Sequence, residues 1–170
     1  AVSVLWMYFV ERLSLKFGML EPRICRVLDE YYWFHERHKL VSLLHVMEGA
    51  FAGTPFKNIV SRLQGIRVGK RVFDDGFQCN EYTLISIGDY TNLNVEGLIQ
   101  PHTLEEAVFK SDYVKIGKGC TLGVACNIHY GVTFGDFVVL EPNTFVVKGE
   151  IADADTTWRG NPPRAVGGRT

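Results

Sequence analysis

The stretch that decides the fold is VKIGKGCTLGVACNIHYGVTFGDFVVLEPNTFVVKG, residues 114–149. Every sixth residue in it is large and apolar: Ile116, Leu122, Ile128, Phe134, Leu140 and Val146. The position two residues earlier is mostly small, and the position after it is often glycine or acidic. This period of six is typical of a hexapeptide repeat. It predicts a triangular parallel β-coil, with Phe134 over Ile116, Leu140 over Leu122 and Val146 over Ile128, about 4.8 Å apart.

The same period extends upstream through Ile87, Leu93 and Ile99, and it fails at two places. Between residues 67 and 83, around Asp74-Asp75-Gly76, the six-residue step is lost, so we expect a deformed first rung. Between Ile99 and Ile116 the step is seventeen residues. That break predicts a loop extruded from the coil over Pro101–Asp112, and long loops inside compact repeats tend to be functional. We assign residues 66–166 to the coil and 167–170 to a tail.

Residues 1–65 predict an N-terminal helical segment. Ala1–Val10 carries no charge, and two interpretations are open: an amphipathic helix, or the end of a membrane-spanning helix. Cys25–Glu48 mixes aromatic and charged residues and continues at helical spacing, which predicts an amphipathic helix. Thr54-Pro55 predicts the start of a short helix over Phe56–Leu63.

Composition limits the classes of function. The 170 residues are 46% hydrophobic and 22% charged with a net charge of −1, which excludes general disorder and argues against a nucleic-acid partner. The four cysteines contain no CxxC pair, so we expect reduced thiols. The chain begins with Ala1 rather than Met, and we expect it to be a fragment of a larger protein.

His102 is the first candidate catalytic residue, at the mouth of the predicted loop. Glu105 follows three residues later, and an imidazole beside a carboxylate suits a general base that deprotonates an amine or hydroxyl attacking a thioester. The alternative is a solvated loop histidine. His129 occupies a turn position of the repeat and is either a second catalytic or substrate-binding group or a histidine that caps a corner of the coil.

Other polar residues carry weaker signals. Asn92 and Asn94, on the rung before the loop, either bind substrate or tolerate the corner conformation. Three acidic residues on the irregular rung, and two histidines in the N-terminal segment, are interpreted as turn and surface groups: Asp74, Asp75, Glu81, His35 and His38. No HxxxxH pair occurs, so we predict no metal site.

The run from Val114 to Val166 resembles the closing coils of left-handed β-helix acyltransferases of the maltose and galactoside acetyltransferase type. That resemblance implies a left-handed coil, a catalytic histidine on the extruded loop at the place of His102, and a closing GNPA-like segment at residues 160–163. We expect Trp158, Asn161 and Arg164, in and around this segment, to line the thioester arm, although Trp158 could equally close the coil.

A second resemblance covers about Trp33 to Val166. HERHKL, GTPFKNIVSRLQGIRVGKRVFDDGF, SIGDYTNLN, IQPHTLEEAVFKSD and HYGVTFGDFVVLEPNTFVVKGE together resemble the terminal domain of the non-ribosomal peptide synthetases typified by ε-poly-L-lysine synthase. The resemblance implies a phosphopantetheine thioester on a carrier domain as the cofactor. It implies four kinds of partner: adenylation and carrier domains of the same synthetase, sister β-helix domains or a homotrimer, and a membrane reached through flanking helices. It further implies a membrane-associated protein with the coil on the cytoplasmic side.

The activity implied by this resemblance is amide (isopeptide) bond formation. An amino-acid amine would attack the aminoacyl thioester, with His102 taking the proton, Glu105 orienting His102, and His129 or Asn94 holding the substrate or the developing oxyanion. Two alternatives stay open: an O- or N-acetyltransferase that uses acetyl-CoA, and a non-catalytic scaffold coil within a trimer or pseudo-trimer.

Overall fold

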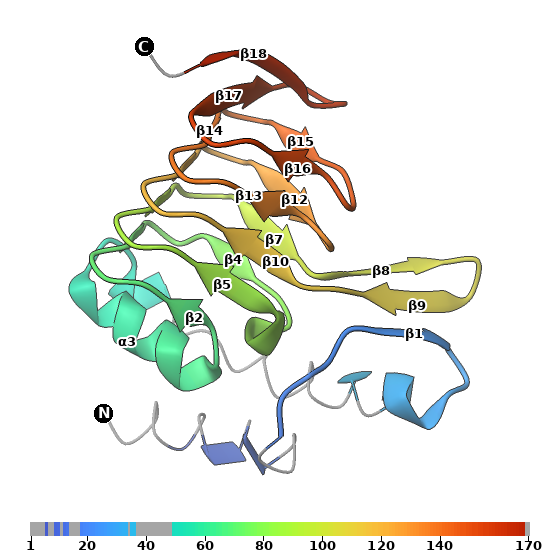
Figure 1. Cartoon of the computed structure of the whole chain (residues 1–170). Coiled ribbons are helices and arrows are strands. Elements are labelled where there is room, and N and C mark those ends of the chain that lie inside the picture. Colours follow the sequence, from blue (N-terminus) through green and yellow to red (C-terminus); the bar gives the residue numbers. More distant parts are fainter. Residues whose placement is uncertain are drawn as a thin grey trace.

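The computed structural model describes residues 6, 9–10, 12–13, 18–33, 35–36 and 49–168, and its body is a left-handed parallel β-helix with three flat sides (Figure 1). One side is the ladder β2 (Arg67–Val68), β5 (Ile85–Ile87), β10 (Val114–Ile116), β13 (Thr133–Phe134) and β16 (Ile151–Ala152). The second side is β3 (Phe73–Asp74), β6 (Asn92–Leu93), β11 (Thr121–Leu122), β14 (Val139–Leu140) and β17 (Thr156–Arg159). The third side is β4 (Gln78–Cys79), β7 (Leu98–Gln100), β12 (Asn127–His129) and β15 (Phe145–Val146).

The strand register confirms the predicted stacking of like residues. Leu122 pairs with Leu140 and Ile128 with Val146, each eighteen residues apart, and Lys115 with Thr133 sets the same step for the side that carries Ile116. These aliphatic residues fill the interior and are almost completely buried. Cys120 and Cys126 occupy the small positions beside them, and all four cysteines are free thiols. The fold class predicted from the repeat is therefore confirmed.

The first rung is irregular, as expected. Val68 pairs with Ile87 and Cys79 with Ile99, so the step there is nineteen or twenty residues instead of eighteen. Oδ1 of Asp74 accepts hydrogen bonds from the backbone N–H groups of Gly76 and Phe77, which makes the predicted turn. The 3₁₀ helix η3 (Tyr82–Leu84) follows this rung.

The helix α3 (Pro55–Gln64) lies against the first rung, preceded by the 3₁₀ helix η2 (Gly49–Phe51), and it matches the short helix predicted over 56–63. Its buried face is polar, with Asn58 donating a hydrogen bond to the carbonyl oxygen of Val72. At its other end the coil closes on the antiparallel pair of β17 and β18 (Arg164–Gly168).

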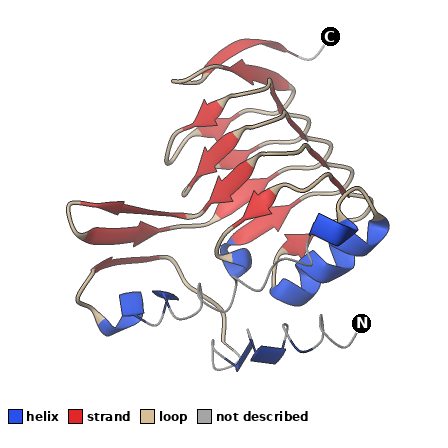
Figure 2. Cartoon of the chain, turned by 180° about the vertical axis from the view of Figure 1, so that it is seen from behind, coloured by secondary structure: helices blue, strands red, loops and turns tan. Residues whose placement is uncertain are grey.

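The predicted loop is a β-hairpin that leaves the coil after β7 and returns at β10 (Figures 1 and 2). Its strands are β8 (His102–Glu105) and β9 (Val108–Ser111), and the turn residues Glu106 and Ala107 both have positive φ angles, near 51° and 59°. Such a pair of left-handed residues fits a two-residue hairpin turn. Because the hairpin is inserted between rungs, Ile87 pairs with Ile116 instead of with a residue eighteen positions away.

The N-terminal segment adds a third strand to the hairpin. β1 (Arg23–Arg26) pairs antiparallel with β9, and residues 30–33 and 35–36 are helical. The predicted amphipathic helix over 25–48 is therefore wrong at its start, because Cys25 lies in the strand β1, which pairs with the free edge of β9. Residues 37–48 of that prediction lie outside the described residues.

The predicted membrane association is contradicted. Among the residues that the structure describes, no helix has the length and apolar character needed to cross a bilayer. The predicted end of a membrane helix at residues 1–10 lies mostly outside the described part of the chain, which includes only residues 6, 9 and 10 of that stretch.

Candidate active site

His102 lies at the base of the hairpin and is nearly enclosed. It is the first residue of β8, and its side chain is 11% exposed. Its ring stacks on that of Phe109 in β9, with ring centroids 5.5 Å apart. Phe109 is itself buried, because Tyr32 and His35 of the N-terminal segment pack against its ring. The hairpin and the N-terminal segment together therefore shield His102 from solvent.

Glu81 is the carboxylate that contacts His102. Oε2 of Glu81 lies 2.8 Å from Nδ1 of His102, and Oε1 lies 2.8 Å from Nε2 of His35. Burial raises the pKa of Glu81, but hydrogen bonds from the two imidazoles and their charges outweigh burial and lower the pKa to about 2. Glu81 is therefore ionised at neutral pH, and a carboxylate can only accept hydrogen bonds.

Glu105, the expected partner of His102, contacts two lysines instead. Its oxygens lie 3.0 Å from Nζ of Lys110 and 2.5 Å from Nζ of Lys148. The reason is the hairpin itself: side chains of a strand alternate between faces, so residues three positions apart point to opposite sides. The three-residue spacing of His102 and Glu105 brings side chains together in a helix or an irregular loop, but these two residues lie in the strand β8.

Two of the histidine and acid assignments made from sequence are corrected. His35 was expected at the surface, but it is 2% exposed and packed between Phe109 and Glu81. Glu81 was interpreted as a turn residue, but it is buried and ion-paired. The sequence did contain a signal for the burial of His35. Tyr32 and Tyr31, three and four residues earlier, lie on the same face of a helix as His35, and both also pack on Phe109. His38 lies outside the described residues.

His129 lies close to the root of the hairpin. In the third side of the coil it pairs with Gln100, two residues before His102, and its ring packs on that of Phe145 at 4.9 Å. Burial lowers the pKa of His129, and nearby Lys148, together with His102 when that ring is protonated, lowers it further against a smaller opposing effect of Glu105. The structure thus brings His102 and His129 into one electrostatic environment, with His129 favoured in the neutral form.

The other predicted site residues lie elsewhere in the chain. Asn92 lies in β6 on the second side of the coil and Asn94 follows that strand, whereas the hairpin joins the third side to the first. The Asn94 amide donates a hydrogen bond to the carbonyl oxygen of Leu122, 2.7 Å away. Trp158, Asn161 and Arg164 lie at the closing end, where the indole Nε1 of Trp158 donates to Oγ1 of Thr156. β17 and β18 lie at the closing end of the coil, several rungs from β8, which carries His102 (Figure 1).

One cluster of the described residues has ligand atoms close enough to hold a metal ion: His35, Glu81 and His102, whose ligand atoms lie within 4.8 Å of one another.

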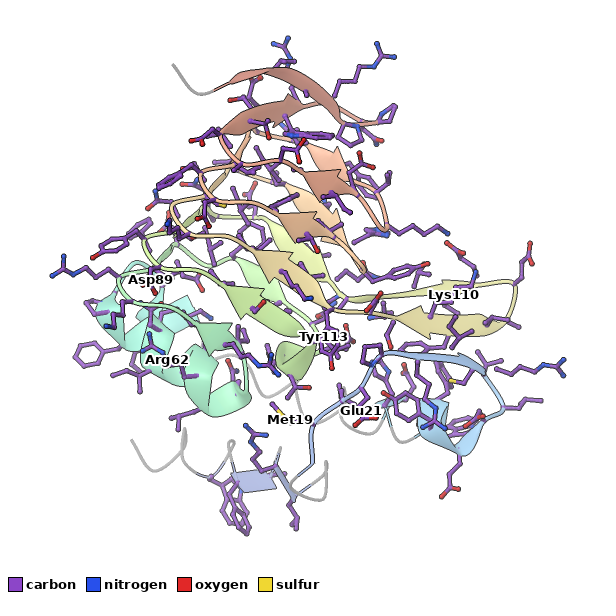
Figure 3. All side chains as sticks on the ribbon, in the orientation of Figure 1. Met19, Glu21, Arg62, Asp89, Lys110 and Tyr113 are labelled. Atoms are coloured by element: carbon purple, nitrogen blue, oxygen red, sulfur yellow. The ribbon has the colours of Figure 1, made fainter. Side chains whose placement is uncertain are left out.

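A separate cavity of about 230 Å³ is lined by residues that include Thr83, Tyr113, Arg67 and Lys115. Tyr113, which is labelled in Figure 3, marks the position of this cavity below the point where the hairpin returns to the coil. The positive charges of Arg67 and Lys115 in the cavity lining suit an anionic group such as a carboxylate or phosphate.

The stacked hexapeptide rungs give the chain a fold like that of the hexapeptide-repeat acetyltransferases. A galactoside acetyltransferase in complex with coenzyme A superimposes with a TM-score of 0.62 at 15% identity, over 87% of each chain. A maltose O-acetyltransferase from Clostridium difficile 630 gives 0.56 at 17% identity, over 88% of this chain and 94% of that chain. At these identities the likeness shows the fold.

A relative in sequence is the delta-poly-L-ornithine synthetase of Acinetobacter baumannii strain AB307-0294. The two are 28% identical over 149 residues, which cover 85% of this chain and 11% of the relative. The chain thus spans only about a tenth of the length of that protein. No protein-family model matches the chain.

Proposed function

We propose that this chain forms amide bonds by transferring an aminoacyl group from a carrier-bound phosphopantetheine thioester to the amine of an amino acid or growing chain. Two findings support the proposal: the fold is that of thioester-dependent acetyltransferases, and the sequence is related to a delta-poly-L-ornithine synthetase. The observation that carries it is the buried imidazole of His102 held on a buried carboxylate at the base of the hairpin.

In the proposed reaction the amine nitrogen attacks the thioester carbonyl carbon, and His102 takes the proton that the amine loses. Glu81 faces Nδ1 of His102, so Nε2 is the ring nitrogen left for this transfer. The carboxylate of Glu81 stabilises the imidazolium that forms. The C–N bond forms as the C–S bond breaks, and the imidazolium returns its proton to the departing thiolate.

The remaining roles rest on position. Neutral His129, near the root of the hairpin, would donate a hydrogen bond to the substrate or to the developing oxyanion. Asn92 and Asn94 remain predictions as substrate-binding residues, and Trp158, Asn161 and Arg164 remain predictions for the thioester arm. Glu105 would act on the site only through Lys110 and Lys148, to which it is ion-paired. The carrier and adenylation domains, and a trimer or sister coils, are the partners this reaction calls for.

A second candidate function is transfer of an acetyl group from acetyl-CoA to a small amine or hydroxyl. The solved galactoside acetyltransferase with bound coenzyme A, and a hexapeptide-repeat acetyltransferase from Vibrio cholerae with bound acetyl-CoA, favour it. Donor choice separates the two: the synthetase domain responds to an aminoacyl group on a carrier, whereas the acetyltransferase binds the free cofactor. A coil that accepts neither donor would be the scaffold of the third alternative.

Replacing His102 by Asn tests the assignment of the base. The Asn amide keeps a donor near the position of Nδ1 for Glu81 and removes the ring nitrogen that would take the proton. We expect kcat to fall by about 10²–10⁴ with little change in the unfolding midpoint. The matched control is Glu106→Gln in the exposed hairpin turn, which should keep wild-type activity. An active, folded His102→Asn protein would refute the role of His102.

A further inference from the structure

His35 makes the N-terminal segment part of the candidate active site. It lies 46 residues before Glu81 in the sequence, outside the coil, yet its Nε2 atom reaches Oε1 of Glu81 at 2.8 Å. Its ring also lies against Phe109, at 4.6 Å between centroids, and edge-on to His102, at 5.4 Å. Histidine and glutamate are rarely buried together unless they are paired, so this contact is a specific feature of the fold.

The two imidazoles use different oxygens of the same carboxylate. Oε1 of Glu81 faces His35 and Oε2 faces His102, and the side chain is 4% exposed. The contact at His35 is a hydrogen bond, and because an ionised carboxylate accepts and cannot donate, Nε2 of His35 carries the hydrogen. Nδ1 of His102 lies 2.8 Å from Oε2 without hydrogen-bond alignment, and an ionised carboxylate at that distance favours a hydrogen on Nδ1. A neutral His102 ring with its hydrogen on Nδ1 has its lone pair on Nε2, which is the form a general base requires.

Without His35, Oε1 of Glu81 would have no partner, and only the contact of Oε2 with His102 would oppose rotation of the carboxylate. Rotation of the Glu81 carboxylate would move Oε2 away from Nδ1 of His102 and leave a buried charge half paired, which costs free energy. The T-shaped contact of the two rings and their shared packing on Phe109 keep the three groups in one arrangement. His35 therefore fixes the direction of the Glu81 carboxylate.

We infer that His35 is a positioning residue: by donating Nε2–H to Oε1 of Glu81, it holds Oε2 on Nδ1–H of His102 and so keeps the lone pair of His102 on Nε2. This inference rests on the proposed function for its catalytic consequence. Its structural part concerns the hydrogen positions in His35, Glu81 and His102 and stands without any substrate.

The same three residues could instead be metal ligands, and the distances argue against that use. Tetrahedral zinc ligands at their usual bond lengths lie about 3.4 Å from each other. The two nitrogen-to-oxygen distances to Glu81 are both 2.8 Å, the length of a hydrogen bond from an imidazole to a carboxylate. The arrangement is therefore that of a His–Glu–His relay, hydrogen-bonded at His35 and in close contact at His102.

The test compares His35→Gln with His35→Phe in the full chain. The Gln side chain places an amide donor near the position of Nε2 and should preserve the relay, whereas Phe keeps the packing on Phe109 and removes the donor. The readout is the tautomer of His102, from the ¹⁵N and ¹H shifts of its ring. We expect Nδ1–H in the wild type and in His35→Gln, and a mixture of tautomers in His35→Phe.

Kinetics give the second readout. His35→Phe should lower kcat about 10–100-fold without raising KM, and His35→Gln should restore most of it, as for other residues that orient a reacting histidine. Tyr32→Leu, which changes a ring contact on Phe109 but not the contact to Glu81, is the control for loss of packing and should keep the tautomer.

Three results would overturn the inference: a wild-type His102 with its hydrogen on Nε2, an unchanged tautomer in folded His35→Phe, or one tightly bound metal ion per wild-type chain that Glu81→Gln removes. The wild-type spectrum is decisive even if His35→Phe does not fold. The tautomer needs no substrate, so an inactive protein with the expected tautomers would refute the proposed function and leave the relay intact.

Discussion

At the scale of single residues, the two histidines near the hairpin, His102 and His129, differ in the charged groups that surround them. His102 faces the carboxylate of Glu81, whereas His129 is half-buried and lies near Lys148. Burial is the largest cause that lowers the pKa of His129; the charge of Lys148, and that of His102 whenever its ring is protonated, add to it, and Glu105 opposes them. Its neutral imidazole can donate one hydrogen bond and accept another, which suits a group that holds an uncharged substrate atom.

The His129 pKa can be measured by following its ring proton in an NMR titration. We expect a midpoint below the ordinary value of 6.5, and a higher midpoint in Lys148→Gln, because a nearby positive charge is removed. Since the unfolded chain binds the proton more readily than the folded chain, the stability that His129 contributes decreases as pH falls through 6.5, until the folded form is protonated too. A wild-type midpoint above 6.5 would contradict the environment described for this ring.

At the scale of elements, the coil depends on close contact between the corners of successive rungs. Gly117 lies at a corner where an added Cβ atom would meet the backbone of Gly135 and Asp136, at 2.5 Å from the carbonyl carbon of Gly135. The same approach recurs one rung earlier, where a Cβ on Gly88 would lie 2.5 Å from the carbonyl carbon of Gly117. Glycine at these corners therefore sets the spacing of the rungs.

Gly117→Ala should destabilise the coil by roughly 1–3 kcal/mol, because the backbone of the next rung must move to make room for a methyl group. The measurement is the free energy of unfolding in urea. Gly49→Ala is the matched control, since nothing lies within 4 Å of the position of its Cβ atom and its φ angle is not positive. Equal stability of the two variants would show that the corners have more space than the structure gives them.

The coil and the hairpin position could be predicted from sequence because both depend on a local period. The six-residue step placed Leu122 under Leu140, and its failure after Ile99 marked where the chain leaves the coil. The partner of His102 could not be predicted in this way. Glu81 comes from the irregular first rung and His35 from the N-terminal segment, where no repeat relates position in sequence to position in space. Glu105 seemed the partner only because the strand pairing of the hairpin was unknown.

At the scale of the whole molecule, the coil is a rigid stack that carries its candidate site at one corner. The hairpin leaves between the third and first sides, β1 pairs with its edge, and His35 from the same N-terminal segment reaches the carboxylate beneath it (Figures 1 and 2). The predicted thioester-arm residues lie several rungs away, at the closing end. The proposed transfer at His102 would therefore need a long, flexible arm such as phosphopantetheine, carried either by a carrier domain or by coenzyme A.

The most direct test offers the chain both kinds of donor with one amine. Lysyl and ornithyl thioesters on a phosphopantetheine-bearing carrier protein, and acetyl-CoA in parallel, are mixed with the free amino acid, and the amide product is quantified by mass spectrometry. We expect a dipeptide amide from the carrier-bound aminoacyl donor, formed well above the rate without protein, and lost in His102→Asn. Acetylated amino acid as the sole product, or no amide from either donor, would contradict the proposed function.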